Sequence, residues 1–201
     1  MILTEKTIYK LHQKLGLEKC GEKIVDIVWI HSQIVKEIAL QIATDLENKY
    51  QIKTNKKLIE IGSLIHDIGC YDYFDKDFNV SKNYISHGKT GYNILNKNKY
   101  SEEICRFALV HIGVGIEDMI PITLEEEIVA FADNFHSKKP VSFNTYEESK
   151  KKLESFEQNK GIILDRYKAK FEIPNLDKIK EKYEKWHKET NKWIDEIKIV
   201  R

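Results

Sequence analysis

Five polar side chains stand where the helical pattern of the sequence calls for apolar residues: His31, His66, Asp67, His111 and Asp133. His31 lies one turn after Ile27, and Asp133 follows Val129 by four residues. A buried carboxylate without a partner is costly, so both aspartates need one. No Lys or Arg stands at the inward-facing positions of these helices, so a metal ion is the simplest partner for the two carboxylates.

For any one of these histidines, the simplest alternative is a core residue whose ring nitrogens are satisfied by hydrogen bonds. The five groups together favour a metal site, because imidazole and carboxylate in combination suit transition metals. Successive helical residues point about 100° apart, so His66 and Asp67 reach one ion only if it lies off the helix end. Alternatively, Asp67 bridges to a second ion while His66 holds the first. Gly69 ends this helix and leaves its terminus open.

The elements that must position these groups are helical, and no strand is predicted. Ile27, Ile34, Ile38 and Ile42 recur at helical spacing around His31. We predict further helices over about 56–68, from about 86, and from about 101 to Gly113 or Gly115. Capping boxes at Thr123 and Thr145 open helices to about 137 and 170, with a break near Gly161 in the second. The fold class is therefore all-α, with a long loop over 70–85.

After Pro174, an amphipathic stripe predicts a long C-terminal helix: Leu176, Ile179, Tyr183, Trp186, Trp193 and Ile197. We expect this stripe to pack against protein rather than to bind a cofactor. Packing on its own domain and packing against a second subunit, as in a homodimer, are equally open. His12 and His187 are predicted to be surface residues on polar helix faces.

Composition limits the classes of function. The 201 residues include 33 basic and 32 acidic ones, a net charge of +1, which disfavours a nucleic-acid polymer as partner. No run approaches the roughly 18 apolar residues of a membrane span, and no signal peptide is recognised. Three widely spaced cysteines, Cys20, Cys70 and Cys105, indicate reduced thiols and a cytoplasmic protein.

The ordered set of motifs resembles the HD superfamily of metal-dependent phosphohydrolases. The motifs are His31, His66-Asp-Ile-Gly69, His87-Gly-Lys-Thr-Gly91, His111-Ile-Gly-Val-Gly115 and Phe131-Ala-Asp-Asn134. The stretch from Phe135 to Pro140 and Phe143-Asn144 looks like a branch of small HDIG proteins. The resemblance implies one domain over 1–201, an HD helical bundle with its core at about 21–140 and a helical extension over about 145–201.

The resemblance also implies a ligand set. His31, His66, Asp67 and Asp133 would hold a first metal ion. His87 and His111 would hold a second, with Asp67 bridging and acting as the catalytic residue, as in HD-type diadenosine tetraphosphate hydrolases. The cofactor would be one or two divalent ions per chain: Fe or Mn before Zn, Mg, Ni or Co.

Substrate recognition departs from the family at one position. Many relatives carry Lys or Arg three residues after the aspartate, where this chain has Cys70. Lys89, Arg106 or Lys138 would supply the cation instead, and His136 would either contact substrate or support a metal ligand from behind. In the loop 70–85, aromatic residues would either stack a nucleobase or simply cover the site.

The function indicated is hydrolysis of a nucleotide or other small anionic phosphoester by metal-activated water. Two alternatives remain open at the level of sequence. One is an HD-fold diiron oxygenase, which shares the ligand order. The other is a catalytically degenerate domain that binds a nucleotide as a sensor.

Overall fold

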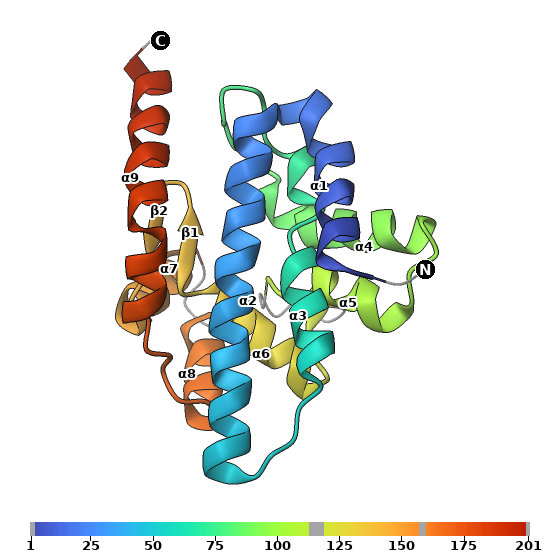
Figure 1. The fold of residues 1–201 in the computed structure, drawn as a ribbon, viewed down its shortest axis with the longest axis vertical. Helices are drawn as coiled ribbons and strands as arrows, with labels where there is room; N and C mark the ends of the chain where they lie inside the picture. Colours follow the sequence, from blue (N-terminus) through green and yellow to red (C-terminus); the bar gives the residue numbers. More distant parts are fainter. Residues whose placement is uncertain (1–2, 113–118, 157–159, 200–201) are drawn as a thin grey trace.

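The computed structural model describes residues 3–112, 119–156 and 160–199. Among them, helices account for nearly all of the regular structure (Figure 1). The helices are α1 (Glu5–Cys20), α2 (Glu22–Tyr50), α3 (Lys56–Ile65), α4 (His87–Lys97), α5 (Glu102–Val110), α6 (Leu124–Asp133), α7 (Tyr146–Phe156), α8 (Lys160–Lys170) and α9 (Asp177–Ile199). Two short 3-10 helices, η1 (Cys70–Asp72) and η2 (Tyr84–Ser86), interrupt the loop before α4.

Helix α2 is the central element of the fold (Figure 1). Helices α1, α3 and α6 all pack against it, and α9 runs alongside it on the side opposite α1. The face of α2 that carries Ile27, Ile34 and Ile38 is fully buried, as its spacing predicts. His31 lies on this same face with 0% of its surface exposed. The core therefore surrounds His31 on all sides except toward the site described below.

Side-chain caps begin several of the helices as the sequence predicts. Thr123 accepts from the backbone N–H of Glu126, and the Glu126 side chain reaches back to the backbone N–H of Thr123, which completes the capping box of α6. Thr145 and Glu148 make the same reciprocal contacts before α7. Because caps satisfy N–H groups that the helix leaves unpaired, they fix where each helix begins.

Helix ends differ from prediction at two places next to the site. Helix α3 ends at Ile65, so His66 and Asp67 lie in the turn that follows it. Helix α6 ends at Asp133 and does not continue to residue 137. The predicted end of the fourth helix at Gly113 or Gly115 lies outside the described residues. In both helices, the chain leaves the helical path at the residues that carry polar side chains into the site.

The sequence predicts no strand, and this prediction is wrong for one short segment. Strands β1 (His136–Lys138) and β2 (Val141–Phe143) form an antiparallel hairpin in which His136 pairs with Phe143. Pro140 lies in its turn, after the cis Lys139–Pro140 peptide. Three-residue strands give too little alternation for a sequence pattern to reveal. The all-α class stands, since this hairpin is the one sheet among the described residues.

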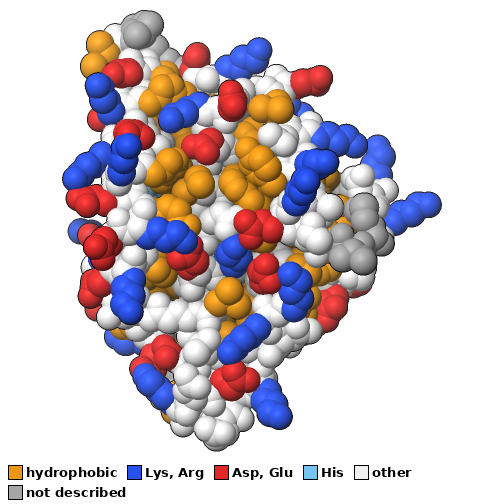
Figure 2. Space-filling view, viewed as in Figure 1, with side chains coloured by type: hydrophobic (Ala, Val, Ile, Leu, Met, Phe, Trp, Pro, Cys, Tyr) orange, Lys and Arg blue, Asp and Glu red, His pale blue; other side chains and the backbone are white. Residues whose placement is uncertain are grey.

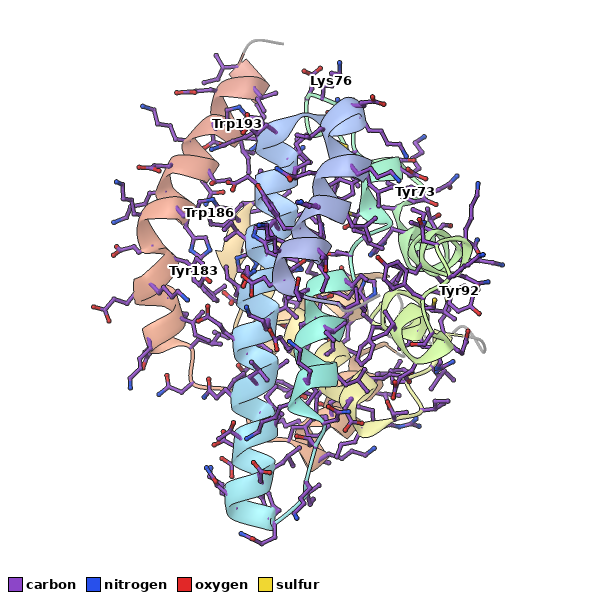
Figure 3. All side chains as sticks on the ribbon, turned by 45° about the vertical axis from the view of Figure 1, so that its right-hand side comes forward. Tyr73, Lys76, Tyr92, Tyr183, Trp186 and Trp193 are labelled. Carbon is purple, nitrogen blue, oxygen red and sulfur yellow. The ribbon has the colours of Figure 1, made fainter. Side chains whose placement is uncertain are left out.

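Helix α9 packs against α2, which is one of the two alternatives that its apolar stripe left open. Trp186 donates from Nε1 to Asp26 of α2 at 2.9 Å, and the Tyr183 hydroxyl donates to Glu37 of α2 at 2.7 Å. Figure 3 shows Tyr183, Trp186 and Trp193 on the side of α9 that faces α2. Val141 of β2 exchanges two hydrogen bonds with the Asn191 side chain, so α9 is also tied to the hairpin.

The distribution of charged side chains on the surface agrees with the near-zero net charge of the sequence. Figure 2 shows basic and acidic side chains interspersed over one face, without a large patch of either sign. Within the described part of the chain, no helix combines the length and apolar character needed to cross a membrane. The three cysteines are all buried and unpaired, as the sequence predicts.

Candidate metal centre

Six side chains from five helices, or from the turns that follow them, meet at one site. His31 comes from α2, His66 and Asp67 from the turn after α3, and Asp133 from the last residue of α6. His87 begins α4, and His111 immediately follows α5. The potential ligand atoms form two groups within each of which all atoms lie within 4.8 Å: His31, His66, Asp67 and Asp133, and Asp67, His87 and His111.

The Asp67 carboxylate belongs to both groups. Its Oδ2 lies 3.2 Å from Nε2 of His31 and 3.2 Å from Nε2 of His66. Its Oδ1 lies 3.2 Å from Nε2 of His87 and 3.5 Å from Nε2 of His111. Each oxygen therefore faces a different pair of imidazoles, which is the arrangement of a carboxylate that bridges two cations.

The turn after α3 brings Asp67 to α4 through a close backbone approach at Gly69. A Cβ at this position would lie 2.2 Å from the His87 carbonyl oxygen and 2.3 Å from the Gly91 nitrogen. Because both obstacles are backbone atoms, only a glycine permits this contact. The Gly69 contact therefore sets the distance between Asp67 and His87.

Three of the four histidines use Nδ1 to bind a carbonyl three residues earlier. The Nδ1 of His66 bonds to Ser63 O at 2.6 Å, that of His87 to Tyr84 O at 2.5 Å, and that of His111 to Ala108 O at 2.9 Å. A carbonyl can only accept, so Nδ1 carries the proton in each ring. Their Nε2 atoms are thereby directed at the centre, as expected of metal-binding histidines.

Two buried polar atoms of the centre, His66 Nε2 and Asp67 Oδ1, have no hydrogen-bond partner. Nitrogens and oxygens around one ion at about 2.1 Å lie about 3 Å apart when their bonds are perpendicular, close to the separations seen here. The donor set and the unpartnered atoms fit a divalent transition metal ion. The two clusters can thus hold metal.

Lys138 of β1 provides positive charge at the centre. Its ammonium donates to Asp67 Oδ2 and lies 3.3 Å from Nε2 of His31. Burial alone raises the pKa of Asp67, but the charges of Lys138 and His66 outweigh burial and hold it well below its usual value. Burial likewise lowers the pKa of His66, but Asp67 and Asp133 raise it to about 10. The two carboxylates therefore attract positive charge strongly.

His31 differs from the other three histidines in how its Nδ1 is bound. Its partner is Nδ1 of His136, at 2.8 Å, and no backbone carbonyl takes this place. Nε2 of His136 in turn lies 3.0 Å from Nε2 of His187 on α9. Burial, with the neighbouring His31 and His187, holds the pKa of His136 well below its usual value, so this ring is neutral.

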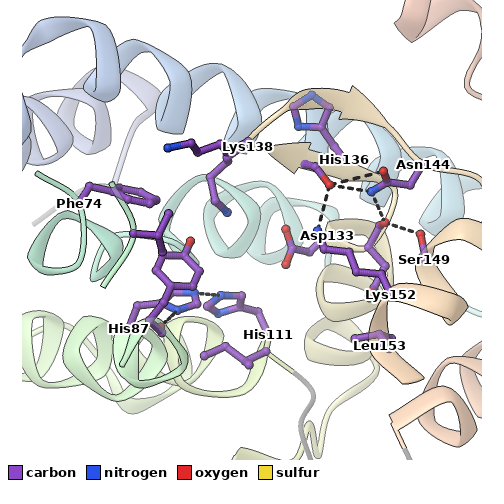
Figure 4. A pocket seen from close by; sticks show the side chains of 16 residues that line it. Phe74, His87, His111, Asp133, His136, Lys138, Asn144, Ser149, Lys152 and Leu153 are labelled. Carbon is purple, nitrogen blue, oxygen red and sulfur yellow. Dashed lines mark hydrogen bonds between the residues drawn. The ribbon is translucent and has the colours of Figure 1, made fainter. Parts of the chain in front are cut away.

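A pocket of about 310 Å³ opens onto the centre (Figure 4). Figure 4 shows His87, His111, Asp133 and Lys138 around this pocket, together with the rest of the lining. Phe74 and Tyr84 form an apolar part of the lining, whereas Leu153 lies away from Phe74, next to Lys152 (Figure 4). The opposite side carries hydrogen-bonding groups of the hairpin and α7: Ser137, Asn144, Ser149 and Lys152. The pocket thus combines an apolar wall, a polar wall and the cluster of candidate ligands.

The predicted substrate-binding residues divide into two sets. His136 and Lys138 line the pocket, although His136 is also the hydrogen-bond partner of His31. Lys89 is exposed on α4 and is not among the lining residues. Arg106 of α5 binds Glu126 at 2.7 Å and 3.1 Å and donates to Ile120 O at 3.1 Å, away from the lining.

The two histidines predicted to be surface residues are both placed differently. His12 is completely buried, with Nδ1 2.7 Å from the Tyr71 hydroxyl and Nε2 2.8 Å from Leu64 O. His187 is half-buried and stacks on His136. Both follow an inward residue by four positions, Ile8 and Tyr183 respectively, and this spacing is the signal that identifies them.

Lys152 was not identified from the sequence. It lies on the helix opened by Thr145, among several surface lysines, and its ammonium donates to Ser137 Oγ at 3.1 Å. Nothing in the local pattern separates it from Lys150 or Lys151. Its place in the pocket depends on how α7 folds back over the hairpin.

A comparison with known families matches the stretch of the chain that carries the candidate ligands. Residues 28–138 match the family model described as HD domain, a span that covers more than half of the chain. The chain belongs to the HD domain family. All six candidate ligands lie within the matched HD region, as do Lys89, Arg106, His136 and Lys138. Helices α7, α8 and α9 lie beyond it.

Two curated relatives each match a little over half of the chain. An uncharacterised protein of Methanocaldococcus jannaschii is 34% identical over 128 residues, which are 57% of this chain and 67% of that protein. A tRNA (cytidine(56)-2'-O)-methyltransferase of Picrophilus torridus is 30% identical over 129 residues, 58% of this chain. The match spans 33% of that methyltransferase.

Among solved structures, the HD domain of the L. monocytogenes phosphodiesterase PgpH matches with a TM-score of 0.48 and 20% identity. The match covers 79% of this chain and 96% of that domain.

Proposed function

We propose that this HD protein is a metal-dependent phosphohydrolase that acts on a nucleotide or another small phosphoester. The observation that carries the proposal is the Asp67 carboxylate, whose two oxygens face two separate pairs of histidines. In phosphohydrolases, two adjacent ions share a bridging group and bind both the nucleophile and the phosphoryl oxygens. The placement of Asp67 supports an equivalent two-ion arrangement here.

The proposed ligands follow the two clusters. His31, His66, Asp67 and Asp133 hold the first ion, while Asp67, His87 and His111 hold the second. Mixed imidazole and carboxylate ligands favour Fe or Mn. When bound, the ions lower the pKa of a coordinated water and neutralise charge that develops on the phosphoryl group.

The chain's own residues then bind and orient the substrate. Lys138, next to Asp67, lies where it can pair with an anionic phosphoryl oxygen. The ammonium of Lys152 presents donors on the polar wall, and Phe74 and Tyr84 offer apolar surface to the organic part of the ester. Because the pocket combines cations with an apolar wall, it suits a small phosphoester better than an uncharged substrate.

Metal analysis is the first test. The protein is purified without chelator or affinity nickel, and Fe, Mn, Zn, Co and Ni are counted per chain by elemental analysis. We expect about two equivalents of Fe or Mn. The loaded protein is then assayed against nucleotides, phosphodiesters and phosphomonoesters, with O₂ uptake recorded in parallel and Asp67→Asn as the inactive control.

The outcomes separate the three functions. Turnover of a phosphoester that disappears in Asp67→Asn supports the proposal. O₂ consumption without release of phosphate or alcohol would replace the proposal with the oxygenase. Tight nucleotide binding without turnover would replace it with the sensor, and a protein that binds no metal after reconstitution would remove all enzymatic readings of this site.

A further inference from the structure

A chain of three imidazoles links the candidate metal centre to helix α9. His31 Nδ1 lies 2.8 Å from His136 Nδ1, and His136 Nε2 lies 3.0 Å from His187 Nε2. His31 and His136 are buried, and His187 is half-buried. Helix α9 lies outside the matched HD region, so His187 is an addition to the family core.

The direction of these hydrogen bonds decides whether His31 can bind metal. An ion on Nε2 needs the lone pair of that nitrogen, so the proton of a neutral ring must be on Nδ1. His136 Nδ1 must then accept, which places the proton of His136 on Nε2. That proton must in turn be donated to Nε2 of His187. A ligand-competent His31 therefore requires an acceptor on α9.

The other three histidines do not depend on such a chain. Their Nδ1 atoms face the backbone carbonyls of Ser63, Tyr84 and Ala108, which can only accept. An imidazole can donate or accept at either nitrogen. His31 is therefore the one candidate ligand, among those described, whose tautomer is set by side chains from outside its own helix.

We propose that His136 and His187 are positioning residues that hold His31 in the tautomer with Nε2 free for metal, which makes α9 part of the metal centre. This inference rests on the proposed metal site, although it does not depend on which reaction the site catalyses. Partners of this kind are known to orient metal-binding histidines and raise their basicity.

The surroundings hold the three linked imidazoles of His31, His136 and His187, the histidine relay, in place. The rings of His136 and His187 stack with centroids 5.2 Å apart and planes 20° from parallel. Phe143 packs edge-on against both rings. Asn191, one turn after His187, binds the backbone N–H and carbonyl of Val141 at 2.9 Å and 2.7 Å. These contacts hold His187 against β1, so the acceptor is present before any ion arrives.

Two substitutions of His187 separate hydrogen bonding from packing. His187→Phe keeps a stacked ring but removes the acceptor, whereas His187→Gln keeps an acceptor and loses the ring. The readout is the dissociation constant for Mn²⁺, measured by titration calorimetry on the full chain after chelator treatment. We expect His187→Phe to weaken the binding of the first ion about tenfold, and His187→Gln to restore it to within about threefold of the parent.

A second measurement observes the tautomer directly and needs no variant. In protein labelled with ¹⁵N at histidine and loaded with Zn²⁺, the ring shifts of His31 should show a protonated Nδ1 and a coordinated Nε2. His136 should show a protonated Nε2. Circular dichroism and thermal unfolding verify that each variant retains the helical fold.

The results distinguish this inference from the proposed function. Equal Mn²⁺ affinity in the parent and a folded His187→Phe variant would overturn the relay and leave the phosphohydrolase proposal intact. So would a Zn²⁺-loaded His136 protonated on Nδ1. Conversely, a parent that binds two ions and shows the expected tautomers, but hydrolyses no phosphoester, would support the relay and refute the proposed reaction. A parent that binds no metal would refute both.

Discussion

The Nε2 atoms of His87 and His111 lie 2.9 Å apart, although both rings already donate through Nδ1 to carbonyls of their own chain segments. Two neutral rings in this state direct lone pairs at the same point. Such a pair repels unless a cation lies between or beside the two nitrogens. Burial lowers the pKa of His111 to about 4, so a proton is poorly held there, and a metal ion meets the requirement better.

This geometry predicts that the two ions are lost separately. His111→Ala should reduce metal content from about two equivalents to about one, because the first cluster keeps all of its ligands. Asp67→Ala should remove both ions, since each cluster uses one of its carboxylate oxygens. Elemental analysis of the purified variants, with circular dichroism as a check of helicity, measures the difference.

One result would exclude Asp67 as the bridging ligand. Unchanged metal content in a folded Asp67→Ala variant would remove it from the centre. Ser63→Ala is a suitable control, because its buried hydroxyl makes no hydrogen bond and its contact with His66 is made by the backbone carbonyl, which the substitution keeps.

Lys138 leads to a prediction about the protein without metal. Its ammonium pairs with the fully buried Asp67, and the charge of Asp67 raises the pKa of Lys138 well above its usual value despite burial. Lys138→Met should therefore destabilise the metal-free protein by about 3 kcal/mol, since removing one partner leaves a buried charge uncompensated. Bound metal should compensate for most of this loss. Urea unfolding with excess chelator and with excess Mn²⁺ measures both values.

The same variant tests substrate recognition. If Lys138 binds a phosphoryl oxygen, Lys138→Met should raise KM for an anionic substrate about tenfold or more at saturating Mn²⁺. The matched control is Lys89→Met, whose exposed side chain lies outside the pocket lining and should leave KM unchanged. The opposite ranking of the two variants would assign the substrate cation to Lys89, as the sequence alone allowed.

Much of this site was predictable because its residues interrupt strong helical patterns. His31 on α2 and Asp133 on α6 break apolar stripes that only a buried face would carry, so their convergence follows from the burial of both stripes. The residues around His66 and Asp67 were harder to place. The pattern predicted a helix through both, whereas α3 ends at Ile65 and the turn allows Asp67 to face two clusters.

The relay and the polar wall could not be read from the sequence for a different reason. His136 was predicted either to contact substrate or to support a metal ligand, and the β1–β2 hairpin that carries it is too short to give a periodic signal. His187 and Lys152 lie far along the chain, and only the docking of α9 and α7 brings them to the centre. Spacing along one helix shows that a residue is buried, but it does not name the partner across the interface.

His12 gives the protein a pH-dependent stability. Its neutral ring fits its surroundings, since Nε2 donates to Leu64 O and Nδ1 accepts from the Tyr71 hydroxyl. Burial lowers its pKa from 6.5 to about 4. As pH falls below 6.5 the unfolded chain binds a proton at this residue, while the folded protein does not until about pH 4. Stability should therefore fall across this window by on the order of 3 kcal/mol from His12 alone.

The variant His12→Gln isolates this contribution. Glutamine can donate to Leu64 O and accept from Tyr71 without titrating, so its stability should decline less steeply between pH 6.5 and pH 4. Urea unfolding at several pH values, with chelator in every sample, cancels the contributions of the metal-site histidines. Parallel stability curves for the parent and the variant would show that His12 titrates normally.

Gly69 makes the metal centre sensitive to the addition of a single methyl group. In Gly69→Ala the new Cβ would meet the His87 carbonyl oxygen and the Gly91 nitrogen, so α4 must move away from the turn that carries Asp67. We expect a destabilisation of about 3 kcal/mol, because the obstacle is backbone and cannot rotate aside. We also expect the ion held by His87 and His111 to be lost first. The control is Gly161→Ala in α8, where the Cβ would meet only the flexible end of Glu154. Urea unfolding and metal content of both variants test the prediction. A Gly69→Ala protein as stable as Gly161→Ala, with both ions in place, would show that the spacing of Asp67 and His87 does not depend on this contact.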